Sequence, residues 1–453
     1  MKITTIGLFI ICALNLCVSQ EMAFPKEHWQ QYQTPEEAGF STQKLKLLED
    51  SFTQNGGDVL LVIHNGIILM KKGPTSRRFR QASIRKSYLS ALFGRYVRQG
   101  VINLEDTMAD LNIDDLQPLT EEEQKARVID LLSARSGIYL PAAYTLQSNI
   151  DRMPPRGSHA PGTFWYYNNW DFNTLLTIFN QQTGQDFFET FKKEIADPLG
   201  MEDFRLFDTY YRQEDSVSKH PAYLFKMSAR DMARFGLLFL NEGRWQKEQL
   251  IPQSWVEQST SVHTEDLGPD FDHKGSYGLL WWISDDIKGE RMYYASGAGG
   301  QRICILPQSQ LVLVHLTDTY QRKGVRDAQI QQMVELLLDA KSGDAIAHPT
   351  LLDHDPQGVE VDKISPDPAF MAKIAGVYHH RFLGEFKIQP KKDKVVMTTG
   401  IGRFNLYPIE PDTFFVEDME IPCQFKPGEE AQKHTIEAIL DDDRMVTQVI
   451  FYY

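Results

Sequence analysis

The order of strand-like and helix-like segments along the chain constrains the fold more than any other feature. Two β-rich runs flank an Asn-Gly pair in residues 58–73, a pattern typical of a β-hairpin. Helical patterns fill residues 83–243, strand-like segments return between 276 and 317, and a last helical pattern covers 325–341. Strands at both ends of one domain predict an α+β fold: an antiparallel sheet flanked by helices, with a large helical insertion.

The rest of the chain divides into two further parts. Residues 342–368 are polar and punctuated by prolines, which predicts a linker after a main domain of residues 20–341. From 369 to 453, short alternating segments recur every ten or so residues. This spacing predicts a small all-β domain, a barrel or a sandwich.

The first residues have the layout of a secretory signal peptide. One lysine precedes an apolar stretch from Ile6 to Val18, with small residues at Cys17 and Ser19. We expect residues 1–19 to be removed by cleavage near Ser19, which leaves a secreted or periplasmic protein. Lipid attachment at Cys17 is the less favoured alternative, because bulky Leu16 precedes it. No later stretch predicts stable insertion into a membrane.

Composition excludes some classes of protein. The formal net charge is -14, and Lys and Arg do not gather into a basic tract, so nucleic-acid binding is not expected. Cys304 and Cys423 follow the leader, and two separate buried thiols are favoured over one long-range disulfide. No Cys/His spacing indicates a metal, and nothing indicates an oligomeric state.

A Ser-x-x-Lys pattern occurs at residues 41–44, 83–86 and 216–219. Catalysis would require the serine at a helix start and the lysine one turn later, buried so that its amine is neutral. The first match lies on an amphipathic surface helix, where the serine is a cap, and a proline follows the third. An apolar stripe behind the second match predicts an internal helix. The alternative is that Ser83 only caps the helix and Lys86 extends to solvent.

Two further segments carry suitable chemistry. After a Pro-Gly turn come two overlapping Tyr-x-Asn matches, Tyr166/Asn168 and Tyr167/Asn169. A phenol close to a lysine can exchange protons with a serine, and an amide can hold the lysine and a substrate carbonyl. An aromatic core strip at a helix start is the alternative interpretation.

The second of these segments is a predicted strand that ends in Ala295-Ser296-Gly297. Further glycines at positions 299 and 300 allow close approach of a ligand to the backbone. Such an edge can offer an N–H group to a developing oxyanion, together with the N–H of Ser83. A glycine-rich β-turn would explain the segment equally well.

In this order and spacing, the three motifs resemble the serine β-lactamase and penicillin-binding-protein superfamily. The chain is most similar to class C β-lactamase-like serine hydrolases, which include esterases, D-aminopeptidases and 6-aminohexanoate-dimer hydrolase. The resemblance spans roughly Glu36 to Lys341 and includes "LLSARSGIY", "DPLGM", "SARDMARFGLLFL" and "GRWQKEQLIPQSWV". It implies a β-lactamase/transpeptidase-like fold, and a weaker similarity links the C-terminal part to the small β-barrels of such hydrolases.

The resemblance also implies roles for individual residues. Ser83 would be the nucleophile, Lys86 its base partner and Tyr167 the second proton carrier. Tyr167 is preferred to Tyr166 because its distance to the following helix matches the family. The implied substrate and oxyanion contacts are Asn169, Ser296, Gly297 and Ala298. The mechanism implies neither a metal nor an organic cofactor.

The third motif departs from the family pattern at Ala295, where β-lactamases and peptidases carry lysine or histidine. That cation grips a substrate carboxylate, so its loss predicts weak recognition of penicillins. Arg302 lies nearby in sequence, and two interpretations stay open: a charge supplied to the site from another angle, or a surface arginine.

The sequence therefore predicts a secreted serine hydrolase that cleaves a small-molecule or peptide-like ester or amide through an acyl-enzyme on Ser83. One alternative is a β-lactamase or a D-Ala or D-amino-acid peptidase, and another is a non-catalytic binding or sensor protein. Neither a G-x-S-x-G elbow nor a His-Glu-x-x-His run occurs. Pocket walls are expected from residues 142–159 and 261–274.

Overall fold

A computed structural model describes residues 22–265, 267, 275–319, 324–354, 361–380, 384–399, 402–416, 421–429, 433–440 and 446–453. The predicted signal peptide, its cleavage site at Ser19 and the alternative lipid site at Cys17 lie outside these residues. In the described part of the chain, no helix combines the length and apolar character that crossing a membrane requires.

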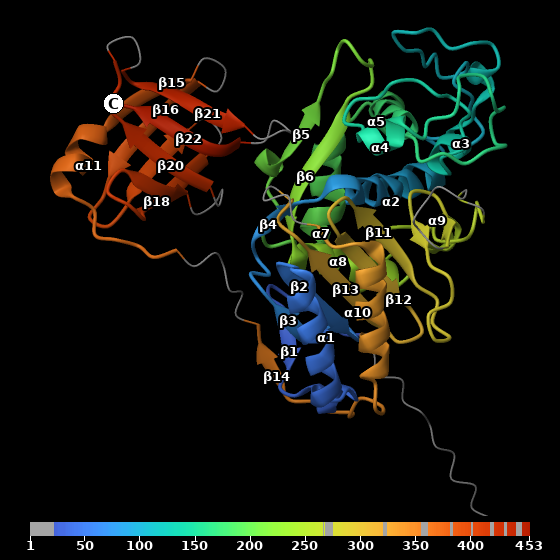
Figure 1. Ribbon diagram of the computed structural model, residues 1–453, viewed down its shortest axis with the longest axis horizontal. Helices are drawn as coiled ribbons and strands as arrows, with labels where there is room; N and C mark the ends of the chain where they lie inside the picture. Colours follow the sequence, from blue (N-terminus) through green and yellow to red (C-terminus); the bar gives the residue numbers. More distant parts are fainter. Residues whose placement is uncertain are drawn as a thin grey trace, which may run out of the picture.

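The main domain is built on one twisted sheet with strands from both ends of the domain (Figure 1). The strand order is β14-β1-β3-β2-β13-β12-β11-β10-β9, and neighbours are antiparallel except β1 and β3. The strands are β1 (Gln30–Tyr32), β2 (Val59–His64), β3 (Ile67–Lys72), β9 (Ser276–Tyr277), β10 (Trp282–Ile283), β11 (Tyr293–Gly297), β12 (Gln301–Leu306), β13 (Leu311–Leu316) and β14 (Leu351–Asp353). The predicted hairpin is β2 and β3.

Helices cover both faces of this sheet. α1 (Thr42–Asn55) and α10 (Asp327–Asp339) lie side by side on one face, and α8 (Ala229–Leu240) covers the other (Figure 1). Strand alternation explains the division: on β13, His315 faces Phe52 of α1, whereas Val312 meets Gly236 of α8. The sheet is therefore buried on both faces, which accounts for its nearly continuous apolar strands.

The predicted helical insertion lies between β3 and β9. Its helices are α2 (Arg85–Arg98), α3 (Val128–Leu132), α4 (Gln147–Ile150), α5 (Asn169–Thr183), α6 (Phe187–Phe191), α7 (Asp197–Leu199), α8 and α9 (Gln253–Ser259). A small sheet, β4-β6-β5, and the two-stranded pair of β7 and β8 accompany them. These strands are β4 (Arg78–Arg80), β5 (Thr209–Arg212), β6 (Ala222–Ser228), β7 (Arg244–Trp245) and β8 (Glu248–Gln249).

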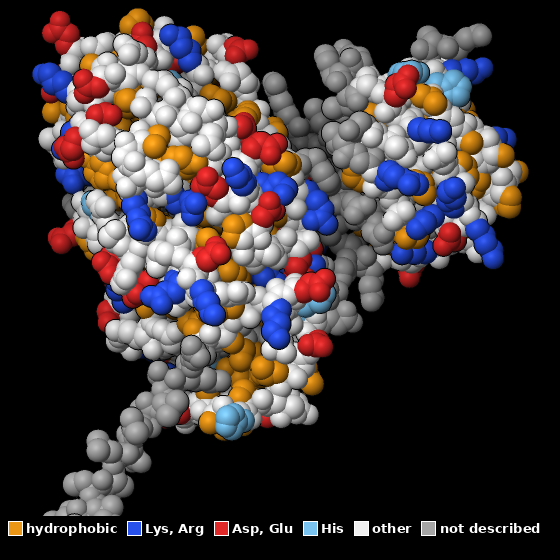
Figure 2. Space-filling view, turned by 180° about the vertical axis from the view of Figure 1, so that it is seen from behind, with side chains coloured by type: hydrophobic (Ala, Val, Ile, Leu, Met, Phe, Trp, Pro, Cys, Tyr) orange, Lys and Arg blue, Asp and Glu red, His pale blue; other side chains and the backbone are white. Residues whose placement is uncertain are grey.

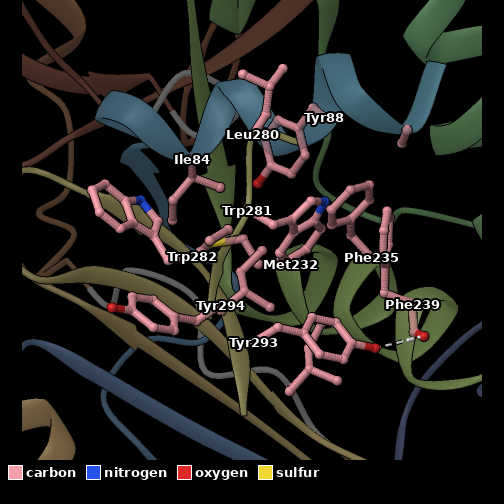
Figure 3. Close-up of a cluster of buried hydrophobic side chains, with 14 of the residues drawn as sticks. Ile84, Tyr88, Met232, Phe235, Phe239, Leu280, Trp281, Trp282, Tyr293 and Tyr294 are labelled. Atoms are coloured by element: carbon pink, nitrogen blue, oxygen red, sulfur yellow. Dashed lines mark hydrogen bonds between the residues drawn. The ribbon is translucent and has the colours of Figure 1, made fainter. Parts of the chain in front are cut away.

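Helix α2 lies inside the domain, as its apolar stripe predicts. Ile84 and Tyr88 contribute to a buried aromatic cluster between α2, α8 and the sheet (Figure 3). On the opposite side Gly94 is in contact with Trp255, since a Cβ at Gly94 would fall 2.2 Å from that ring. A helix enclosed in this way can bury polar side chains along its length, which the site requires.

The first strand-like segment of the predicted 276–317 region, residues 276–284, forms two short strands joined by a turn. Leu280 adopts φ +64° in that turn, and β9 and β10 pair antiparallel. Ser87 and Ser90 of α2 donate hydrogen bonds to the carbonyl oxygens of Leu280 and Leu279, each at 2.8 Å. The turn thus depends on contacts with α2, which a local pattern of apolar residues does not reveal.

Residues 342–354, the first part of the predicted linker, are attached to the main domain. The backbone N–H groups of Ser342 and Ile346 donate to the carbonyl oxygens of Gly39 and Glu37, and β14 pairs with β1. His354 is buried, with its ring nitrogens 2.7 Å from Lys71 Nζ and 3.2 Å from Thr75 Oγ1. The sheet edge and these polar contacts hold a segment that looks like a linker by composition alone.

The C-terminal part is an all-β barrel, as predicted, preceded by α11 (Pro368–Ile374). Its strand order is β15-β16-β17-β18-β19-β20-β22-β21. The strands are β15 (Gly376–His380), β16 (Gly384–Pro390), β17 (Val395–Thr399), β18 (Gly402–Pro408), β19 (Thr413–Val416), β20 (Ile421–Lys426), β21 (Thr435–Leu440) and β22 (Val446–Tyr452). The barrel encloses its own apolar core. Cys423 lies there and Cys304 in the core of the main domain, both buried and free.

Charges of both signs are mixed over the face of the main domain that Figure 2 shows. Lys and Arg side chains alternate there with Asp and Glu, in keeping with the scattered charge of the sequence.

We expect His354→Ala to lower the free energy of unfolding by about 1–3 kcal/mol, because it removes a buried imidazole and leaves its polar partners without one of their contacts. Denaturant unfolding would measure the change. His348→Ala, an exposed position in the same segment, is the control. Equal stability of the two variants would contradict the attachment of residues 342–354 to the domain.

Candidate active site

Ser83 lies in a 3-10 turn, η2 (Ala82–Ile84), that continues directly into α2. The residue before it, Ala82, has φ +46°, in the left-handed region that residues with a Cβ rarely adopt. Such a conformation costs about 1–3 kcal/mol and persists only where the surroundings enforce it. The serine therefore sits on a tightly constrained turn at the start of a buried helix.

Contacts of Gln81 hold this turn in place. Its side-chain amide donates to the carbonyl oxygens of Phe79 and Met227 at 2.9 and 3.2 Å, and accepts from the Tyr88 hydroxyl at 2.9 Å. The end of β11 packs against the same residue: a Cβ at Gly297 would fall 2.5 Å from the Gln81 carbonyl oxygen. Only a glycine at 297 allows this close approach, which brings the third motif to the first.

Lys86 is buried, with 2% of its surface exposed, and its Nζ is 2.8 Å from Ser83 Oγ. The ammonium position lies 4.9 and 4.8 Å from the ring centres of Tyr167 and Phe172. Burial lowers the pKa of Lys86 well below its usual range, and the charge of Arg85 lowers it further. The alternative in which Lys86 extends to solvent is therefore wrong.

The structure separates the two tyrosines. Tyr167 forms a hydrogen bond with Ser83 and stacks on Trp282 at 5.3 Å between ring centres. Burial raises the pKa of Tyr167 to about 12, although that hydrogen bond and the charges of Arg85 and Arg302 lower it. The hydroxyl of Tyr166 instead donates to the carbonyl oxygen of Asn149 at 2.7 Å. Tyr167 is the tyrosine beside the Ser83–Lys86 pair.

The two asparagines differ in the same way. Asn168 caps α5 by accepting from the Trp170 N–H at 3.1 Å, and it donates to the carbonyl oxygen of Ile138. Asn169 donates to the carbonyl oxygen of Tyr144 at 3.0 Å, and its buried Oδ1 accepts no hydrogen bond from the described residues. Of the two asparagines, Asn169 is therefore the one whose side-chain oxygen is available to a ligand.

The third motif contains a buried cation that the sequence left undecided. Arg302 stands opposite Ser296 across the β11–β12 hairpin and is only 3% exposed, so it is not a surface arginine. It donates to Ser296 Oγ and forms an ion pair with Asp327 at the start of α10. The side chain of Ala295 is fully buried. A positive charge is thus present near this edge, but it is already bound to a carboxylate.

A cavity of about 790 Å³ brings most of the predicted residues together. Its lining includes Ser83, Tyr167, Asn169, Ser296, Gly297 and Ala298. Lys86 lies behind Ser83, within the protein. As expected, part of segment 142–159 forms one wall, but no residue of 261–274 does among those that the structure describes.

Several residues near the site escaped sequence reasoning. A second wall comes from residues 212–217, where Arg212 pairs with Glu214 at 2.7 Å. Trp282, on which Tyr167 stacks, carries no motif of its own. Arg85 occupies a variable position of Ser-x-x-Lys, and its burial follows only from the packing around α2. The sequence offered one indication: Arg85 lies on a helix whose apolar stripe predicts that the helix is buried.

Comparison with known proteins establishes the family. Residues 46–337 match the family model described as Beta-lactamase. The chain belongs to the beta-lactamase family, and so to the serine β-lactamase and penicillin-binding-protein superfamily. This confirms the resemblance drawn from the three motifs. A search of curated proteins finds no match.

Solved structures share the fold at low sequence identity. One is a Bacillus anthracis protein assigned as a 6-aminohexanoate-dimer hydrolase: 22% identity, TM-score 0.51, covering 69% of this chain and 89% of that one. A Bacteroides dorei protein assigned as a β-lactamase has 18% identity and TM-score 0.53, with 67% and 100% covered. A penicillin-binding-protein homologue from Caulobacter crescentus has 13% identity and TM-score 0.50, with 67% and 99% covered. These similarities confirm the predicted fold class.

Proposed function

We propose that this protein is a serine hydrolase that cleaves an ester or amide bond through an acyl-enzyme on Ser83. Its family supports hydrolysis in general. The observation that carries the proposal is the 2.8 Å separation of Ser83 Oγ from the Nζ of a buried lysine whose pKa is lowered. A neutral amine at that distance can accept the serine proton.

In the proposed reaction, each residue at the site has a separate role. As Lys86 takes the proton, Ser83 Oγ bonds to the substrate carbonyl carbon, and the carbonyl π electrons move to the oxygen. The backbone N–H groups of Ser83 and Ala298 stabilise that oxyanion. Collapse of the intermediate expels the alcohol or amine, which receives a proton through Tyr167. Water then attacks the ester by the same route and releases the acid.

Asn169 and Ser296 are the proposed substrate contacts. The unpaired Oδ1 of Asn169 can accept a hydrogen bond from a substrate N–H or O–H. Ser296 lines the cavity but already accepts a hydrogen bond from Arg302. We place the scissile carbonyl between Ser83 and the end of β11.

The arrangement of charges favours an ester or amide substrate without a carboxylate. Ala295 supplies no cation, and Arg302 is bound to Asp327. A β-lactamase or a D-Ala peptidase would need such a cation for the carboxylate of its substrate. The alternative of a non-catalytic binding protein rests on the same cavity, and the serine experiment below separates the two. From the leader-like N-terminus we propose that the protein is secreted or periplasmic.

We expect a fluorophosphonate probe to label the wild-type protein but not Ser83→Ala, because Ser83 lines the cavity and has a buried amine 2.8 Å from its Oγ. Lys86→Ala should reduce labelling and ester turnover on the order of 10²–10⁴-fold. Gel fluorescence and hydrolysis of p-nitrophenyl esters would measure these effects. Equal labelling of wild type and Ser83→Ala would favour the non-catalytic alternative.

The neighbouring tyrosines form a matched pair for a second test. Tyr167→Phe should lower kcat about 10²-fold, since it removes the hydroxyl that forms a hydrogen bond with Ser83. Tyr166→Phe, whose hydroxyl contacts only the Asn149 backbone oxygen among the described residues, should stay close to wild type in kcat. A larger loss in Tyr166→Phe than in Tyr167→Phe would reverse the assignment.

Cephalosporin hydrolysis should be slow or absent compared with hydrolysis of neutral esters, because in the described part of the chain Ala295 supplies no cation and Arg302 is already paired with Asp327. Steady-state assays with a chromogenic cephalosporin and p-nitrophenyl acetate would give the ratio of kcat/KM values. Efficient cephalosporin turnover would mean that Arg302 leaves Asp327 to bind the substrate carboxylate.

A further inference from the structure

Arg85, between the nucleophile and the base, is a buried cation for which the proposed chemistry has no direct use. It is the first residue of α2, and its side chain is 0% exposed. It does not line the cavity, so it has no route to a substrate. It is nevertheless the neighbour of Lys86 in α2, and its positive charge acts on that lysine.

The surroundings of Arg85 are aromatic. Its guanidinium lies 4.5 Å from the ring centre of Tyr223 on β6 and 5.6 Å from that of Tyr144 on the cavity wall. Neither Nε nor either terminal nitrogen donates a well-formed hydrogen bond to any described residue, although the Tyr223 hydroxyl is close enough for Arg85 to lower the pKa of that tyrosine. No described carboxylate forms an ion pair with Arg85. The ring faces provide partial compensation for the charge, but they neutralise none of it.

Two other buried arginines, Arg230 and Arg234, have the carboxylate partners that Arg85 lacks. Arg230 forms ion pairs with Asp203 and Glu202 at 2.5 and 2.8 Å. Arg234 contacts Glu202 at 3.0 Å and donates to backbone carbonyl oxygens. A buried charge without a counter-ion destabilises a fold by several kcal/mol, and unsatisfied buried groups concentrate where function requires them.

We propose that Arg85 is a positioning residue of the proposed reaction: a fixed positive charge that holds the neighbouring Lys86 in its neutral form, ready to accept the Ser83 proton. The inference rests on the proposed function, because it assigns Arg85 an action through Lys86 rather than on the substrate. Adding a proton to Lys86 would place two like charges side by side in a medium of low polarity, which is unfavourable.

The choice of arginine over lysine follows from the same physics. A guanidinium keeps its charge when buried, whereas a buried ammonium releases its proton. Arginine is therefore the side chain that can remain a cation beside Lys86. The direction of the effect agrees with this role, since the charge of Arg85 lowers the pKa values of both Lys86 and Tyr167.

The other groups around this pair do not offset Arg85. From α5 and the segment before it, Lys86 meets the rings of Phe172 and Tyr167. Tyr223 faces Arg85 from β6, and the ring of Tyr144 lies 5.6 Å from the guanidinium of Arg85 and 5.3 Å from that of Arg212. From β12, Arg302 acts on Tyr167.

Asp171 of α5 is the buried carboxyl of this region. It accepts hydrogen bonds from Ser136 and Asn168, and its burial raises its pKa well above the usual range. Among the described residues it forms neither a hydrogen bond nor an ion pair with Arg85 or Lys86. The local field is therefore dominated by cations, and Arg85 is the cation nearest to Lys86 in sequence.

The test is Arg85→Met, which keeps an apolar side chain of similar length, with Arg98→Met as the control at an exposed position of the same helix. The acid limb of the pH profile of fluorophosphonate labelling and ester turnover should move up by about one pH unit or more, because Lys86 then holds its proton to higher pH. The alkaline plateau should stay near wild type, and thermal stability should not fall. An unshifted acid limb, or a uniform loss of rate with a lower Tm, would overturn the proposal.

A second measurement does not need activity. With a lowered pKa, folded Lys86 has released a proton that the unfolded chain still holds, so stability due to this group rises with pH up to its ordinary value of 10.5. Comparison of Tm against pH for wild type and Lys86→Met isolates this slope. In the Arg85→Met background the slope should begin at higher pH; an identical onset in both backgrounds would contradict the proposal. The Ser83→Ala result reports separately on the proposed function.

Discussion

The burial of Lys86 beside Ser83 is the constraint on which the rest of the site depends. An ammonium ion is costly to remove from water, so the enclosure of Lys86 by rings and backbone lowers the pKa of its amine well below the usual range. That enclosure requires α2 to run inside the domain, with the sheet and α8 on one side and α5 and α9 on others. In the proposed mechanism, this burial lets a residue that would be a cation at the surface act as a base.

The motifs meet because three distant segments approach the same turn. η2 carries the serine, the segment before α5 carries Tyr167, and β11 carries the glycine edge. The absence of a side chain at Gly297 lets β11 contact the Gln81 carbonyl, and Ala82 is held in a left-handed conformation between them.

Electrostatics decide what the cavity can recognise. Arg302 is bound to Ser296 and Asp327, and Arg212 is paired with Glu214, so both of these described arginines near the cavity already have partners. Arg85 alone among these arginines has no carboxylate partner in the described part of the chain. In the proposed mechanism its charge acts on the protonation of Lys86, whereas the paired charges shape a site suited to a neutral substrate.

Local patterns of the sequence were sufficient to predict most of the secondary structure and the candidate site residues. Hydrophobic periodicity predicted the β2–β3 hairpin, the helical insertion, the strands of the second half and the C-terminal barrel, because these depend on nearest neighbours along the chain. Motif order singled out Ser83 and Lys86, and the apolar stripe of α2 distinguished them from the other Ser-x-x-Lys matches.

Tertiary contacts decided the remainder. The turn at Leu280 depends on hydrogen bonds from α2. The attachment of residues 342–354 depends on the edge of β1, and the charge of Arg302 is paired with Asp327 at the start of α10. No window of sequence contains both sides of such contacts. The sequence by itself determined which residues could perform acyl transfer, and only the tertiary structure decided which charges are buried, paired or alone around them, since burial and pairing are properties of distant segments brought together.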